Sequence, residues 1–294
     1  MSIVLGSLVS LLFMYFKEDI QMNGSFVVVV GVSLIAGRIR PKWTCLAYVM
    51  AVIYGVDNWL VWIGVKSKLM DLSYEKMIDL VGVLHMLEGV LTFSFGGRKS
   101  IPIMTYRGEK IAGGYQSHQS WLIPLLFFKI KAFYIPVIAN IVYANDTFTY
   151  EPEEKAKKMG ILIGGYGLVM LYIARLVSWK HIPLTLAILA MPVLHEGLFL
   201  IDDYLEKGKP KYPYPSFGIR VMEIEEKNGL DISRGDIITS INGRQIINEE
   251  YLMEVINTSI RCTLEIEKLS GEKKSVSCTT QEIKAAKIIF LPMY

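Results

Sequence analysis

The sequence predicts a polytopic α-helical membrane bundle followed by a small α+β domain. Of its 294 residues, 52% are apolar and the mean hydropathy is +0.37, which is too apolar for an ordinary soluble domain. Charge is unevenly distributed, because residues 208–294 hold 12 of the 31 basic and 12 of the 28 acidic side chains. The first 201 residues contain seven apolar stretches, several of them close to the about 20 residues that a membrane helix needs. These observations divide the chain at about residue 206.

Six of the seven stretches carry little charge and predict membrane helices. The seventh, 111–145, is interrupted by Lys129 and Lys131 and by Pro124 and Pro136. The amino terminus lacks a basic segment before its apolar residues and a small-residue cleavage site, so we expect a retained first membrane helix rather than a signal peptide. The six predicted helices lie within 1–16, 20–37, 43–65, 80–97, 159–179 and 181–201.

Basic residues decide the expected orientation, because Lys and Arg are enriched on cytoplasmic loops. If 111–145 does not cross, six spans place both termini on one side with the basic loops 38–42, 98–131, 155–158 and 207–211. We therefore expect a multi-pass protein of the cell membrane with both termini in the cytoplasm and 98–158 partly cytoplasmic or interfacial. The basic residues expected on the other side are Lys17, Lys66, Lys68, Lys76 and Lys180.

Charge and cysteine content exclude several classes of protein. A net charge of +3, spread over the membrane part, does not favour nucleic-acid binding. Cys45, Cys262 and Cys278 show neither disulfide-framework nor zinc-site spacing. The expected partners are therefore the lipid bilayer and other proteins, and the sequence assigns no cofactor, metal or catalytic residue.

The carboxyl-terminal part reads as a compact domain of strands and one main helix. A proline-rich linker, 207–215, precedes a domain at 216–281, and 282–294 is expected to be a tail. Strands are predicted at 218–224 and 236–241, the second closed by an Asn242-Gly243 turn. Asn248 is expected to cap a helix, and 262–267 and 274–279 to form a hairpin.

This domain resembles a bacterial PDZ domain. The resemblance rests on Ser216-Phe217-Gly218-Ile219, Gly229-Leu230 and the string Arg234-Gly235-Asp236-Ile237-Ile238-Thr239-Ser240-Ile241-Asn242-Gly243, and it covers about 215–280. The short helix that usually precedes Gly229 is truncated here to 225–228. The fold class is thus a helical membrane bundle followed by a small α+β PDZ domain.

The resemblance implies peptide binding by β-augmentation, in which a partner's extended carboxyl-terminal segment adds a strand to an exposed sheet edge. The expected position is beside 219–224, with backbone N–H groups at Phe217 and Gly218 facing the terminal carboxylate. An equally weighted alternative is that the apolar members of this set are ordinary core residues. The predicted peptide-binding residues are Phe217, Gly218, Ile219, Leu252 and Val255.

Ionisable residues within the apolar stretches predict an intramembrane polar network. Two strings, 83–89 and 193–197, each place a histidine and a glutamate in an apolar run. Such residues suggest a functional site, with the helices paired around a metal or a proton path, but hydrogen bonding that fixes helix register is the favoured interpretation. The predicted members are Asp57, His85, Glu88, His195 and Glu196.

Three alternative functions remain open. An intramembrane metalloprotease of the site-2 type also combines membrane helices with a PDZ domain, but it requires two histidines four residues apart. His195-Glu196 begins that motif, whereas Phe199 and Gly89 occupy the positions of the second ligand. A serine protease lacks a Gly-x-Ser-x-Gly motif. A transporter with a regulatory PDZ domain would need coupled polar residues over several spans.

The order of parts resembles the MinJ-type division-topology proteins of Gram-positive bacteria. The likeness also rests on the strings 84–89, 113–116 and 121–124. It implies a non-enzymatic membrane adaptor for cell division that links a DivIVA-like polar scaffold to the inhibitor pair MinC and MinD. The partners would contribute carboxyl-terminal or extended peptides to the PDZ domain.

Overall fold

A computed structural model describes residues 2–15, 19–65, 72–107, 110–225 and 229–291. Lys17, Lys66, Lys68 and most of the truncated segment 225–228 lie outside the described residues. The chain forms two compact units. We call 1–98, 118–144 and 153–205 the helical unit, and 99–117, 145–152 and 206–294 the sheet unit.

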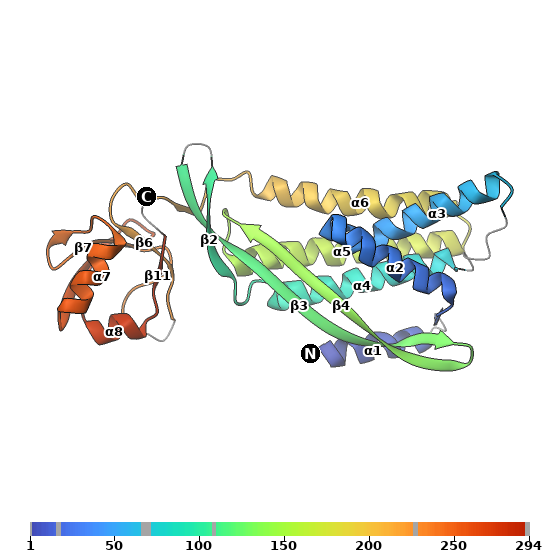
Figure 1. The fold of residues 1–294 in the computed structure, drawn as a ribbon, viewed down its shortest axis with the longest axis horizontal. Helices are drawn as coiled ribbons and strands as arrows, with labels where there is room; N and C mark the ends of the chain where they lie inside the picture. The colour runs from blue at the N-terminus through green and yellow to red at the C-terminus, as the bar shows by residue number, and fades with distance from the viewer. Residues whose placement is uncertain (1, 16–18, 66–71, 108–109, 226–228, 292–294) are drawn as a thin grey trace. The chain divides into compact units, whose positions relative to one another are not determined.

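Among the residues that the structure describes, the helical unit contains six apolar helices, one for each low-charge stretch of the sequence (Figure 1). Among the described residues, α4, α5 and α6 are long and apolar enough to cross a membrane, whereas α1, α2 and α3 are shorter apolar helices. Large apolar side chains such as Leu34, Trp62 and Leu200 are exposed, as expected of surfaces that face lipid. The helices are α1 (Ser2–Tyr15), α2 (Gly24–Ile39), α3 (Leu46–Trp62), α4 (Tyr74–Phe95), α5 (Pro152–Ser178) and α6 (Leu184–Leu205).

The interrupted stretch 111–145 is a long β-hairpin, so the structure excludes a seventh helix there. Strand β3 (Lys110–Ile130) and β4 (Phe133–Thr147) are joined by a turn at Lys131-Ala132 (Figure 1). Strand β2 (Ile101–Arg107) pairs with the first part of β3. Exposed and less exposed residues alternate along β4, the period of two expected for a strand. Pro124 and Pro136 disfavour a helix in this stretch, because a proline inside a helix removes a hydrogen bond.

The end of the hairpin packs on α1 within the helical unit. The Phe13 and Phe127 rings stack with centroids 4.3 Å apart. The Leu126 N–H donates to Ser10 Oγ at 2.9 Å, and a Cβ on Gly6 would lie 2.3 Å from the Pro124 carbonyl oxygen. The short strand β1 (Ile20–Gln21) pairs in parallel with β3. The hairpin is therefore part of the core of this unit.

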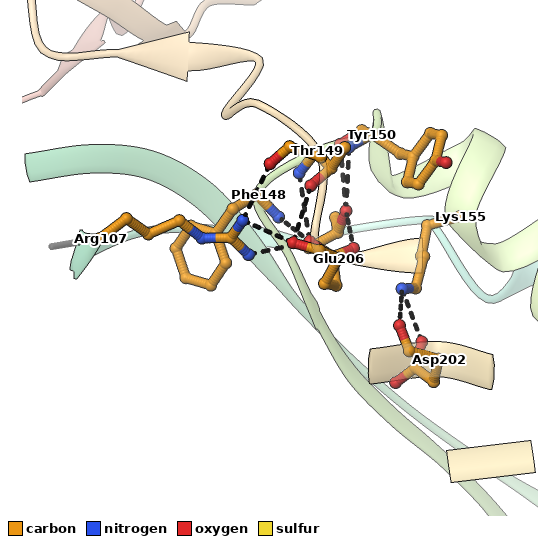
Figure 2. Close-up of polar contacts among 9 residues, drawn as sticks. Arg107, Phe148, Thr149, Tyr150, Lys155, Asp202 and Glu206 are labelled. Carbon is orange, nitrogen blue, oxygen red and sulfur yellow. Dashed lines mark hydrogen bonds and ion pairs between the residues drawn. The ribbon is translucent and has the colours of Figure 1, made fainter. Parts of the chain in front are cut away.

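Glycines let α4 and α5 approach closely. A Cβ on Gly89 would lie 2.5 Å from Gly164 Cα, and one on Gly160 would lie 2.5 Å from the Phe93 nitrogen. Small residues at such contacts are typical of helices packed in membranes. Helix α5 is also tied to α6, because the buried Lys155 pairs with Asp202 at 2.6 Å (Figure 2).

The sheet unit contains a six-stranded sheet in the order β10-β9-β7-β6-β11, with β8 paired to β7. Each strand and the main helix predicted for 216–281 are present. Asn248 accepts a hydrogen bond from the Tyr251 N–H at 2.8 Å and caps α7, as predicted. The elements are β6 (Ile219–Glu223), β7 (Ile237–Ile241), β8 (Arg244–Gln245), α7 (Glu249–Thr258), β9 (Arg261–Glu267), β10 (Lys273–Thr279), α8 (Thr280–Ala285) and β11 (Ile289–Phe290).

Residues 282–291, predicted to be a tail, instead complete this domain. Ile283, Ala286 and Phe290 are buried in the same core as Ile219 and Leu252. The sequence did not reveal strand β11, because a strand of two residues is too short to show a period of two.

The proline-rich linker is also docked within the sheet unit. Its strand β5 (Tyr212–Pro213) pairs with Ala112 and Gly113 of β3. The carboxylate of Glu206 accepts hydrogen bonds from the Phe148 and Thr149 N–H groups at 3.0 and 3.2 Å and pairs with Arg107 at 3.3 Å (Figure 2). The linker is thus a folded part of the sheet unit.

Candidate functional site

A thiol and two imidazoles meet inside the helical unit. Cys45 lies at the amino terminus of α3, His85 in the middle of α4 and His195 in α6. One possible ligand atom from each lies within 4.8 Å of the other two, and Cys45 Sγ lies 3.5 Å from His85 Nε2. The histidines are 5% and 9% exposed and the cysteine is half-buried. We call these three residues the thiol–imidazole cluster.

Hydrogen bonds orient both imidazoles. His85 Nδ1 lies 2.8 Å from the Val81 carbonyl oxygen, which can only accept, so Nδ1 carries the proton. Tyr48 donates its hydroxyl proton to Glu196 Oε1 at 2.9 Å, which leaves its oxygen to accept from His195 Nδ1 at 3.0 Å. In both histidines the lone pair therefore remains on Nε2.

Charged and aromatic groups surround the cluster. Lys42, in the 3-10 turn Pro41–Thr44, pairs with Glu196 at 2.6 Å. The Tyr166 ring packs edge-on against both imidazoles and its hydroxyl donates to the Met191 carbonyl oxygen at 3.0 Å. Glu88 is half-buried on α4, three residues after His85 and on the same helix face.

The structure brings together four of the five residues predicted as an intramembrane network. His85, Glu88, His195 and Glu196 lie in or beside the thiol–imidazole cluster. Asp57 does not, because it lies 12 residues after Cys45 on α3, or about 18 Å along the helix. Asp57 instead accepts a hydrogen bond from Tyr74 at 3.1 Å.

Sequence reasoning missed Cys45, Tyr48, Lys42 and Tyr166. Cys45 is one cysteine at the start of an apolar run, and its distance of 40 residues from His85 matches no local ligand motif. Only the packing of four helices places these groups together. The sequence signal for part of the cluster is the spacing of Cys45 and Tyr48, which are three residues apart and so share one helix face.

The second candidate site is the sheet edge in the sheet unit, where the predicted peptide-binding residues divide into two classes. Ile219 and Leu252 are completely buried core residues, and Val255 packs against the same core. Phe217 is 46% exposed. Gly218 has a φ of +80°, and a Cβ there would lie 2.5 Å from the Ile238 carbonyl oxygen, so the turn requires glycine.

The edge of β6 expected to receive a partner is paired with β11. Val221 faces β7, because its N–H donates to the Asp236 carbonyl at 2.8 Å. The opposite edge of β6 accepts a hydrogen bond from the Leu291 N–H at the Arg220 carbonyl, also at 2.8 Å. Strand β11 runs antiparallel to β6 with a register irregularity between Ile289 and Phe290.

An ionic group in the sheet unit is centred on Glu151. Glu151 pairs with Lys211 at 3.0 Å and Arg234 at 3.3 Å, and it accepts a hydrogen bond from Tyr212. Burial alone would raise the pKa of Glu151, but the hydrogen bonds and the two positive charges outweigh burial and lower that pKa below its usual value. The carboxylate is therefore ionised at neutral pH.

Comparisons of the chain with known protein families, curated proteins and solved structures find no match.

Proposed function

We propose that this protein is a membrane-anchored adaptor whose sheet unit binds a partner's carboxyl-terminal segment by strand addition, as a PDZ domain does. The helical unit would cross the cell membrane and hold the sheet unit at its cytoplasmic face. The role needs no enzymatic chemistry. By the resemblance to MinJ-type proteins, the partners would be DivIVA-like and MinD-like proteins at the division site or cell pole.

The observation that carries the proposal is the position of the chain's own carboxyl-terminal segment. Phe290 lies opposite Val221 and Leu291 bonds to Arg220, so β11 runs antiparallel to β6 and toward Gly218. A partner's carboxyl-terminal peptide would take this direction in β-augmentation. The edge thus already holds a strand of the required orientation, and a partner would replace β11.

Displacement is favoured by the small size of β11. It contributes two paired residues with an irregular register, whereas β9 and β10 pair over seven. A tethered strand nevertheless competes at an effective concentration of the order of millimolar. Removing it should therefore strengthen peptide binding.

The experiment is a titration of the full chain in lipid nanodiscs with a library of carboxyl-terminal peptides. We expect selective binding that tightens at least tenfold when the chain ends at Lys287, and competition by a synthetic peptide of residues 286–294. Phe217→Ala should weaken binding, whereas Ile247→Ala, an exposed apolar control at 73% exposure, should not. Absence of binding by both the full and the shortened chain would contradict the proposal, provided that the shortened chain retains its circular dichroism spectrum.

A further inference from the structure

The thiol–imidazole cluster has the donor set of a transition-metal site. Cysteine sulfur and histidine nitrogen are preferred ligands of Zn²⁺, with bonds of about 2.3 and 2.0–2.1 Å. Two such ligands on one tetrahedral ion lie about 3.5 Å apart. Cys45 Sγ and His85 Nε2 have this separation, 3.5 Å, and one ring nitrogen of His195 belongs to the same group of possible ligand atoms, which all lie within 4.8 Å of one another.

We propose that Cys45, His85 and His195 bind one Zn²⁺ ion through the Cys45 thiolate and the Nε2 atoms of both histidines. Three different helices contribute these ligands, so the ion would join α3, α4 and α6. Three protein ligands leave one tetrahedral position for water or another small ligand.

The hydrogen bonds around the histidines support this assignment. Metal-binding histidines donate their second N–H to a carbonyl or another acceptor, which fixes the tautomer and the ring orientation. His85 does so to the Val81 carbonyl, and His195 does so to the Tyr48 oxygen. Tyr48 is oriented in turn by Glu196, which Lys42 holds. Both Nε2 lone pairs are therefore ready to bind an ion without rearrangement of their partners.

The charges near the cluster also favour a cation. Zn²⁺ bound to one thiolate and two neutral imidazoles carries a net charge of about +1, which needs a compensating negative charge in an apolar interior. Glu88 lies three residues after His85 on α4 and so shares its helix face. Among the residues that the structure describes, its carboxylate has neither a hydrogen-bond nor an ion-pair partner. An isolated carboxylate in such surroundings is unfavourable, and a zinc ion at the thiol would supply its counter-charge.

The chain offers matched controls for each ligand. Cys262 and Cys278 lie in the sheet unit, and His118 and His181 are exposed. None of these four belongs to the thiol–imidazole cluster. Because binding of zinc is independent of peptide binding, failure of this proposal and failure of the adaptor proposal are distinguishable.

The experiment measures metal content and cobalt spectra of the full chain purified in mild detergent. We expect about one zinc per chain, and thiolate-to-cobalt charge transfer after exchange with Co²⁺ in a chain that carries Cys262→Ser and Cys278→Ser. Cys45→Ser, His85→Gln and His195→Gln should each reduce zinc at least tenfold, whereas His118→Gln and His181→Gln should retain it. Should a ligand variant fail to fold, the cobalt spectrum of the chain whose only cysteine is Cys45 still decides the matter. Absence of that charge-transfer band, or zinc that persists in well-folded Cys45→Ser, would overturn the proposal.

Discussion

Replacement of Gly160 by leucine should destabilise the helical unit by about 3 kcal/mol, at the upper end of the usual range for overpacking. A Cβ at this position would lie 2.5 Å from the Phe93 nitrogen and 2.7 Å from its Cα. These are backbone atoms of α4, which cannot move aside as a flexible side chain can. Helices α4 and α5 would have to separate, with loss of their close contact. Thermal unfolding in detergent, monitored by circular dichroism, measures the effect.

Gly165→Leu is the matched control, on the same helix with the same substitution. Nothing lies within 4 Å of a Cβ at Gly165. Substitutions at such open positions usually change stability by less than about 0.5 kcal/mol. Equal unfolding temperatures for the two variants would show that α4 and α5 are not packed as described.

Leu252→Ala should destabilise the sheet unit by about 2–5 kcal/mol, the usual cost of a Leu→Ala cavity in a core. Leu252 is completely buried in the core that also contains Ile219 and Phe290. The sequence suggested both a pocket and a core role for this side chain, and its burial favours the core. Denaturant unfolding of the full chain, followed by hydrogen exchange of sheet-unit peptides, measures the loss.

Met253→Ala provides the comparison, because Met253 is the next residue of α7 and is 39% exposed. We expect its effect on unfolding to stay within about 0.5 kcal/mol. If Leu252→Ala weakened peptide binding while leaving hydrogen exchange unchanged, Leu252 would line a pocket and the assignment to the core would be wrong.

The helices and strands with a strong local pattern could be predicted from sequence. Each low-charge stretch of the first 201 residues forms one helix, because apolar content alone distinguishes it. In the sheet unit, Asn242 and Gly243 both have positive φ, as the predicted two-residue hairpin turn requires. The helix cap at Asn248 was also predictable, because its hydrogen-bond partner, Tyr251, is only three residues away.

The remainder depends on contacts between distant segments. Hydropathy over 111–145 indicated an apolar stretch but averaged out the alternation that makes β3 and β4 strands. Strand β11 has no alternation in its sequence, and it forms because it pairs with the edge of β6. The thiol–imidazole cluster joins residues as much as 150 positions apart, from Cys45 to His195, and tertiary packing alone creates it.

The orientation of the chain in the membrane tests the central claim that the helical unit anchors the sheet unit at the cytoplasmic face. Lys284→Cys and Lys180→Cys would be introduced separately into a chain that carries Cys262→Ser and Cys278→Ser. The same chain without either new cysteine gives the background labelling. Lys284 and Lys180 are exposed, and the distribution of basic residues predicts that they lie on opposite sides. A membrane-impermeant maleimide applied to intact cells should label position 180 and should reach position 284 only after permeabilisation. Labelling of position 284 in intact cells would contradict the account.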